Sequence, residues 1–224
     1  MRVVFMGTPD FSVGTLEALA AAGHEIVGVV TQPDKQKGRG KQVQPTPVKE
    51  AANRLGLPVY QPAKVRDPEF VETLRTLQPD VIVFVAFGQL IPASVLELPK
   101  YGCINVHASL LPAYRGAAPI QWAVINGEKE SGVTIMQMDA GLDTGDMLAK
   151  TVVPLDPEET GGSLFDKLSH AGAELLTETL EKLVQGTLVP EKQPEESPTE
   201  YARMIKKEDG RIDWTRPAAE IERL

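Results

Sequence analysis

Two side chains that could do chemistry together lie at the end of a short apolar run, Cys103 to Val106, which predicts a β-strand. They are Asn105 and His107, and side chains two residues apart on a strand point to the same face. A loop further along, Gly141 to Asp146, adds carboxylates such as Asp143, which could orient or charge the imidazole. An amide donor, an imidazole and a carboxylate are the groups that acid–base catalysis and oxyanion stabilisation use.

Spacing alone leaves structural roles open for each of these residues. A single histidine at a strand end is often only a hydrogen-bonded structural residue. Asn105 also fits a turn, and Asp143 also fits a solvated loop. The elements around them therefore have to show whether they face one cleft.

Short apolar runs rich in β-branched residues alternate with segments of helical periodicity along the first half of the chain. The runs are 3–6, 25–30, 59–60, 81–87 and 103–106, and the helical segments are 11–22, 47–55 and 68–77. This alternation predicts an α/β fold, an open, mostly parallel, doubly wound (Rossmann-like) sheet with helices on both faces. A further strand over 133–138 and a long amphipathic helix over 164–183 follow. Ligands of such sheets bind outside the carboxyl ends of the strands, where Asn105 and His107 are expected.

Composition and missing motifs exclude several classes of protein. The chain has 224 residues, a net charge of −8, one cysteine and no apolar run long enough for a membrane span, so we expect a cytoplasmic protein. Gly7 to Phe11 lacks the glycine spacing of a dinucleotide site, and the three histidines and Cys103 lack metal-ligand spacing. The acidic balance argues against a general nucleic-acid coat, yet residues 34–49 form a local basic island.

An ordered set of motifs resembles the signature of the folate-dependent formyltransferases. It consists of Asn105-x-His107-x-Ser109-Leu110-Leu111-Pro112, Arg115-Gly116-x-x-Pro119 and Gly141-x-Asp143-Thr144-Gly145-Asp146. The start Met6 to Phe11, the insertion within 32–49 and the run Val133 to Met138 resemble the branch of that family that formylates methionyl initiator tRNA. The resemblance covers essentially the whole chain.

The resemblance implies a donor, an acceptor and a set of site residues. The donor would be 10-formyltetrahydrofolate, and the acceptor would be the α-amino group of methionyl initiator tRNA. Asn105, His107 and Asp143 (the trio) would be catalytic, with no metal and no membrane or protein partner. Folate would contact Phe87, Gly88, Leu90, Ile91, Ser109, Leu110, Leu111, Pro112 and Gly141, although Phe87 and Leu90 fit plain core packing equally well. The tRNA would contact Lys35, Lys37, Arg39 and Lys41.

The resemblance also implies a division of the chain. Residues 1–186 would form the catalytic domain, and residues 187–224 (the connector) would lead into a linker helix towards a C-terminal β-barrel domain that is absent here. Alternatives are a formyltransferase for a small amine such as glycinamide ribonucleotide or an amino sugar nucleotide, a formyltetrahydrofolate hydrolase, and a non-catalytic folate- or RNA-binding fragment. The basic insertion favours an RNA acceptor over a small one.

Overall fold

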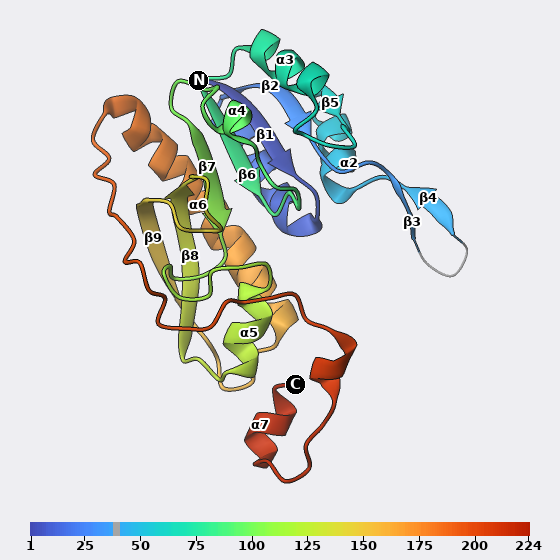
Figure 1. The fold of residues 1–224 in the computed structure, drawn as a ribbon, viewed down its shortest axis with the longest axis vertical. Helices are drawn as coiled ribbons and strands as arrows, with labels where there is room; N and C mark the ends of the chain where they lie inside the picture. The colour runs from blue at the N-terminus through green and yellow to red at the C-terminus, as the bar shows by residue number, and fades with distance from the viewer. Residues whose placement is uncertain (38–40) are drawn as a thin grey trace.

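The fold is built on a 7-stranded sheet with the strand order β5-β2-β1-β6-β7-β8-β9 (Figure 1). The structure is a computed structural model that describes residues 1–37 and 41–224. Its strands are β1 (Arg2–Gly7), β2 (Glu25–Val30), β5 (Val59–Tyr60), β6 (Val81–Val85), β7 (Cys103–His107), β8 (Glu130–Gln137) and β9 (Met147–Pro154). The strands from β5 to β7 are parallel, which confirms the predicted α/β class.

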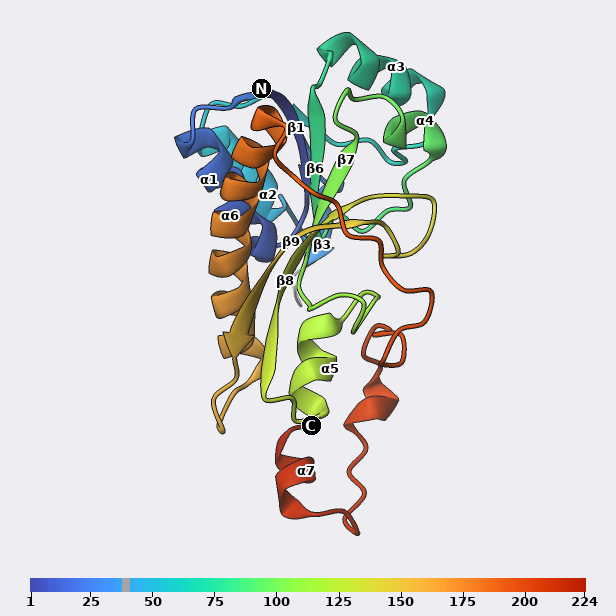
Figure 2. The same ribbon diagram turned by 90° about the vertical axis from the view of Figure 1, so that its left-hand side faces the viewer.

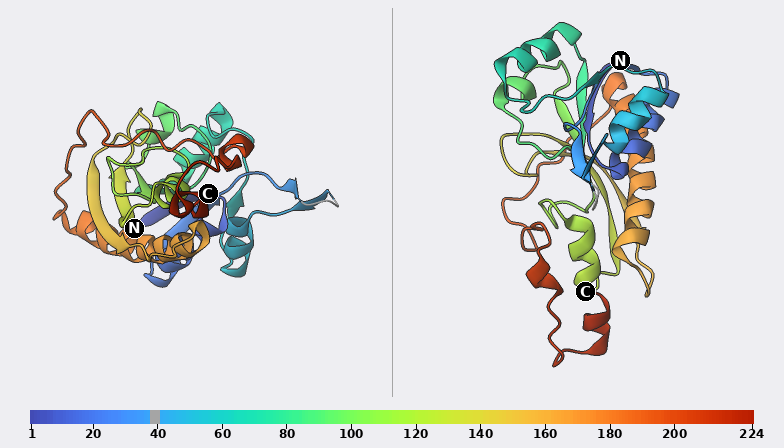
Figure 3. Two further views of the ribbon diagram at one scale, coloured as in Figure 1. Left: turned by 90° about the horizontal axis from the view of Figure 1, so that it is seen from below. Right: turned by 90° about the vertical axis from the view of Figure 1, so that its right-hand side faces the viewer.

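Helices cover both faces of the sheet (Figures 2 and 3). One face carries α1 (Val13–Ala21), α2 (Pro47–Arg54) and α6 (Gly161–Gln185), and the other carries α3 (Pro68–Leu77) and α4 (Ala93–Leu96). Successive residues of β1 enter different cores: Val3 and Phe5 pack in the larger cluster, whereas Val4 and Met6 pack in the smaller one. A strand buried on both faces in this way reads as a continuous apolar run, as the sequence does.

Local sequence signals explain where the helices begin. The side chain of Thr46 accepts a hydrogen bond from the backbone nitrogen of Lys49 at 3.1 Å, and Pro47 takes the first position of α2. Thr160 and Ser163 form a reciprocal capping box at the start of α6.

Neither α6 nor any other helix in the described ranges is both long and apolar enough to cross a membrane.

Strands β8 and β9 run antiparallel to their neighbours, a direction that the sequence pattern does not predict. The helix before β8, α5 (Pro119–Ile125), lies beyond the carboxyl end of β7 (Figures 1 and 2). The chain therefore enters β8 at that end and runs back along β7, pairing Thr134 with His107.

Two short segments of the basic island pair as an antiparallel hairpin that extends from the body of the molecule (Figure 1). Its strands are β3 (Lys35–Lys37) and β4 (Gln42–Gln44), and all of their residues are exposed. Residues 38–40, which include the predicted tRNA contact Arg39, lie outside the described residues.

The connector returns to the sheet after α6. Its short elements are the 3₁₀ helix η2 (Lys207–Gly210) and α7 (Ala218–Glu222). Glu191 forms an isolated antiparallel bridge with Met147, and Ala202 exchanges backbone hydrogen bonds with Arg115 and Ala118. The division of the chain at residue 186 stays a prediction, but part of the connector packs on the domain before it.

Gly132 in β8 gives a test of how closely the antiparallel strands approach. A Cβ atom there would lie well inside contact distance of the Thr151 carbonyl oxygen and the Leu110 side chain. We expect Gly132→Ala to lower the free energy of unfolding by about 1–3 kcal/mol, measured by urea denaturation, because the strands have to move apart. Gly161→Ala is the matched control, since no atom lies within 4 Å of its added Cβ. Equal stability of both variants and the parent would contradict this account of the β8–β9 packing.

Candidate active site

A pocket of about 550 Å³ lies at the carboxyl ends of the central strands. The segments that follow the strands line it: Pro9 and Phe11 after β1, residues 86–91 after β6, and residues 138–143 after β8. The end of β7 and the residue after it, residues 105–108, also line it. Between β1 and β6 the strand order changes direction, because β2 lies on one side of β1 and β6 on the other. This is the crevice in which open α/β sheets bind ligands.

His107, the last residue of β7, lines this pocket and is almost completely buried, with 6% of its surface exposed. Its Nε2 atom lies 3.0 Å from the carbonyl oxygen of Tyr114. A carbonyl oxygen only accepts hydrogen bonds, so Nε2 carries a proton and donates it. The other ring nitrogen, Nδ1, lies 3.9 Å from Oδ1 of Asp143, which is an ion-pair separation rather than a direct hydrogen bond.

Asp143 is held in a fixed orientation towards the histidine. Its Oδ2 atom accepts a hydrogen bond from the backbone nitrogen of Gly116 at 2.9 Å, which leaves Oδ1 on the histidine side. The backbone of Asp143 is left-handed, with φ 57°, and Gly116 has φ 124°. Any side chain at Gly116 would also collide with the backbone of Ala202. The structure therefore brings the predicted carboxylate and imidazole together.

Asn105 completes the trio on the same strand. Its side chain and that of His107 both line the pocket, as expected for residues two apart. Asn105 is half-buried, and its amide makes no hydrogen bond to any other residue in the described ranges. The amide is thus available to a ligand.

The predicted folate contacts fall into two groups. Phe87, Gly88, Leu90, Ile91 and Gly141 all line the pocket. Leu90 is 80% exposed, whereas Phe87 is buried and packs edge-on against Phe84 with ring centroids 6.1 Å apart. Phe87 therefore both belongs to the core and forms part of the pocket wall.

The second group, Ser109 to Pro112, does not line the pocket. The Ser109 hydroxyl donates to the carbonyl oxygen of Ala113 at 2.7 Å, and the backbone nitrogen of Leu111 donates to Thr134 Oγ1 at 3.0 Å. Leu111 is buried against the methionines of β8 and β9. These residues shape the turn that follows β7, and their contact with folate stays a prediction.

The predicted RNA contacts lie on the hairpin, outside the pocket. Lys35 and Lys37 are in β3 and Lys41 precedes β4, and all are exposed. At the base of the hairpin, Lys49 Nζ lies 2.8 Å from Asp34 Oδ2. Hydrogen bonds from Lys49 and then Gln61 hold the pKa of the Asp34 carboxyl below its usual value.

Sequence reasoning missed part of the pocket wall. Met136 and Met138 line it, and their spacing of two residues within the apolar run Val133 to Met138 was the available signal. Met204 of the connector also lines the pocket, although nothing in its local sequence indicates this. Two further side chains, Arg115 and Gln193, lie behind the pocket wall and join the connector to the turn after β7.

Cys103 is not placed for chemistry. It is 1% exposed, and burial raises the pKa of its thiol to about 12, so the reactive thiolate is disfavoured. Within the described ranges, no group of three or more His, Cys, Asp or Glu residues could hold a metal ion.

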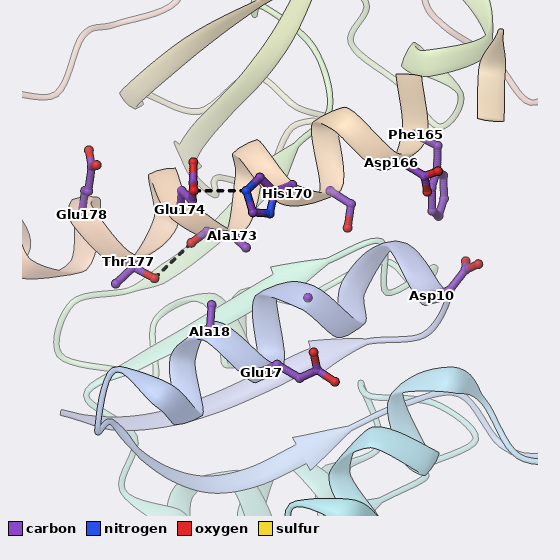
Figure 4. A pocket seen from close by; sticks show the side chains of 12 residues that line it. Asp10, Glu17, Ala18, Phe165, Asp166, His170, Ala173, Glu174, Thr177 and Glu178 are labelled. Carbon is purple, nitrogen blue, oxygen red and sulfur yellow. Dashed lines mark hydrogen bonds and ion pairs between the residues drawn. The ribbon is translucent and has the colours of Figure 1, made fainter. Parts of the chain in front are cut away.

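A second cavity of about 870 Å³ lies between α1 and α6 (Figure 4). Its lining contains none of the predicted site residues. His170 on its rim is 80% exposed and pairs with Glu174 at 3.2 Å. The cavity carries the carboxylates Asp10, Glu17, Asp166, Glu174 and Glu178. It is a solvated acidic groove rather than the site of the trio.

Comparisons with known proteins identify the family of this chain. The family model described as "Formyl transferase" matches residues 1–180. The methionyl-tRNA formyltransferase of Agathobacter rectalis is 62% identical over 224 residues, which cover 100% of this chain and 72% of that protein. The corresponding protein of Citrifermentans bemidjiense is 59% identical over 222 residues, which cover 99% of this chain and 70% of that protein. Among solved structures, this chain is similar to the N-formyltransferase from Helicobacter canadensis in complex with folinic acid and dTDP-3-aminofucose. The TM-score is 0.75 at 21% sequence identity, and the match covers 100% of this chain and 78% of that one. This likeness shows the fold. This chain belongs to the formyl transferase family.

Proposed function

We propose that this protein transfers the formyl group of 10-formyltetrahydrofolate to the α-amino group of methionyl initiator tRNA. The observation that carries the proposal is the convergence of Asn105, His107 and Asp143 on one pocket. The high identity to proteins named methionyl-tRNA formyltransferase identifies the acceptor. A cytoplasmic location remains a prediction that agrees with a role in translation initiation.

The pocket suits a folate. A pterin is flat and apolar on its faces, and its edges carry amide-like donors and acceptors. The pocket offers apolar walls from Phe84, Met136 and Met138, and backbone groups from the loop after β6. Such a mixture of apolar walls and few polar groups is typical of cofactor sites. The bound folate would supply the formyl carbon that the amine attacks.

Asn105 and His107 would act on the formyl oxygen. Attack by an uncharged amine puts negative charge on that oxygen, and the free amide of Asn105 can donate a hydrogen bond to it. With Nε2 engaged by the Tyr114 carbonyl, His107 presents Nδ1 to the reaction, and Nδ1 can donate to the oxygen only when the ring carries both protons. A donor of this kind contributes about 3–4 kcal/mol to lowering a barrier.

Asp143 would stabilise the charged imidazole and help the proton move. Its Oδ1 lies 3.9 Å from His107 Nδ1, so the carboxylate faces the ring nitrogen that the Tyr114 carbonyl leaves free. The proton that leaves the attacking amine must reach the folate nitrogen that leaves. General acid–base assistance of this kind contributes about 10²–10⁴-fold in rate.

The hairpin would bind the tRNA. Lys35 and Lys37 are two residues apart on β3, so their side chains share one face, and Lys41 directly precedes β4. Exposed lysines bind phosphates through charge and position an RNA without reading its bases. A small acceptor such as glycinamide ribonucleotide would not need this projecting element, so the RNA acceptor is favoured.

The role of His107 predicts a large loss of turnover when it is removed. We expect His107→Ala to lower kcat for formyl transfer about 10²–10³-fold, while folinic acid still binds and the melting temperature stays close to that of the parent. His170→Ala, in an exposed histidine of α6, is the matched control and should keep full activity. Normal turnover by His107→Ala would remove the imidazole from the mechanism.

The role of the hairpin predicts a change in salt dependence. We expect Lys37→Ala to lower kcat/KM for methionyl-tRNA and to reduce the slope of log kcat/KM against log salt by about 1, because one phosphate contact is lost. Folate binding should not change. Lys182→Ala, near the end of α6, is the control. An unaltered salt slope in Lys37→Ala would exclude this lysine from the RNA site.

The acceptor itself is tested by comparing substrates. Formyl transfer from 10-formyltetrahydrofolate is measured at low salt to methionyl initiator tRNA, to glycinamide ribonucleotide and to water. Transfer to the tRNA alone is the expected result. Transfer to the ribonucleotide, or release of formate without an acceptor, would instead establish a small-acceptor enzyme or a hydrolase.

A further inference from the structure

Gln193 of the connector is a buried polar residue at the back of the Asp143 loop. Its side chain is 6% exposed. The amide nitrogen Nε2 donates to the carbonyl oxygen of Asp143 at 2.9 Å and to that of Gly145 at 2.7 Å. Nε2 also lies 3.6 Å from Met136 Sδ, but its two shorter contacts are both with the loop that carries the Asp143 carboxylate.

The orientation of the Gln193 amide is set by a second residue. Its Oε1 atom accepts a hydrogen bond from Arg115 Nε at 3.1 Å, so Nε2 must face the loop. The guanidinium of Arg115 also donates to the carbonyl oxygens of Pro194 and Glu195 at 2.7 and 3.1 Å. Arg115 directly follows Tyr114, whose carbonyl oxygen accepts the hydrogen bond from His107 Nε2.

The loop needs an external support of this kind. Asp143 has a left-handed backbone, and Gly145 lies so close to the backbone of Gln137 that it admits no side chain. Left-handed residues other than glycine persist only where surrounding contacts hold them. The backbone nitrogen of Gly116 holds the Asp143 carboxylate. The backbone of the loop, at Asp143 and Gly145, is tied to the connector by the two hydrogen bonds from Gln193.

We propose that Gln193 is a positioning residue that holds the Asp143 carboxylate at its working distance from His107. This inference rests on the catalytic role proposed for Asp143. Gln193 does not itself line the pocket, and it acts through the loop. This role makes the connector part of the support of the active site, although the connector lies beyond residues 1–180, which the family model matches.

The test compares two changes at Gln193 with the same changes at Gln185, the exposed last residue of α6. Gln193→Glu keeps the shape but turns the donor towards the carbonyls into an acceptor. Gln193→Met keeps the length and removes the hydrogen bonds. We expect both to lower kcat at least tenfold, with less than a twofold change in the KM for 10-formyltetrahydrofolate. The Gln185 variants should match the parent.

A double-variant cycle separates positioning from plain structural support. In an Asp143→Asn background, Gln193→Met should have no further effect on kcat, although it should still lower the melting temperature. Additive losses of kcat in the two backgrounds would overturn the proposal, as would unchanged kcat in a folded Gln193 variant.

A measurement without substrate keeps this inference separate from the proposed function. The chain has three histidines, so the ring ¹⁵N signals of His107 can be assigned, with His24 and His170 as internal references. We expect Gln193→Met to shift the Nδ1 signal of His107 alone. An unmoved His107 signal would refute the positioning role of Gln193 even if the parent formylated tRNA. A moved signal would support that role even if the acceptor proved to be another amine.

Discussion

The hydrogen bond from His107 to the carbonyl oxygen of Tyr114 is the contact on which the site depends. It fixes which ring nitrogen carries a proton, and it leaves the other to the pocket. The carbonyl points there because Tyr114 has a left-handed backbone, with φ 56°, which costs of order 1–3 kcal/mol. The Tyr114 side chain offsets this cost: its hydroxyl donates to Glu128 and accepts from Asn126. Burial, followed by the bond to Glu128, raises the pKa of Tyr114 to about 12, so the hydroxyl remains a donor.

The turn that follows β7 is also held from outside by the connector. The backbone nitrogen of Tyr114 donates to Thr199 Oγ1 at 2.8 Å, and Ala202 bonds to the backbone on both sides of Gly116. Figure 1 shows this stretch of the connector crossing towards α5 after it passes the β9 edge. The site is therefore assembled from the strand end, the Asp143 loop and the connector. None of these segments would hold the geometry alone.

The sequence was sufficient for features that arise from local pattern. The apolar runs predicted the parallel strands, Thr46-Pro47 predicted the start of α2, and the spacing of Asn105 and His107 predicted their common face. The direction of β8 could not be predicted, because alternation along a strand is the same in either direction. Gln193 could not be found either, because its partners lie 50 and 78 residues away and its own Pro/Glu-rich segment has no periodicity.

The placement of the basic hairpin follows from the same topology that builds the pocket. The hairpin lies in the connection from β2 to α2, so it leaves the sheet at the carboxyl edge, where the pocket opens. The chain as a whole has a net charge of −8, and the groove between α1 and α6 gathers carboxylates. Exposed charges act over about 8 Å at physiological salt, so phosphates are disfavoured near that groove and attracted near the hairpin. An RNA held by the proposed lysines would therefore be brought to the edge of the sheet at which the trio lies.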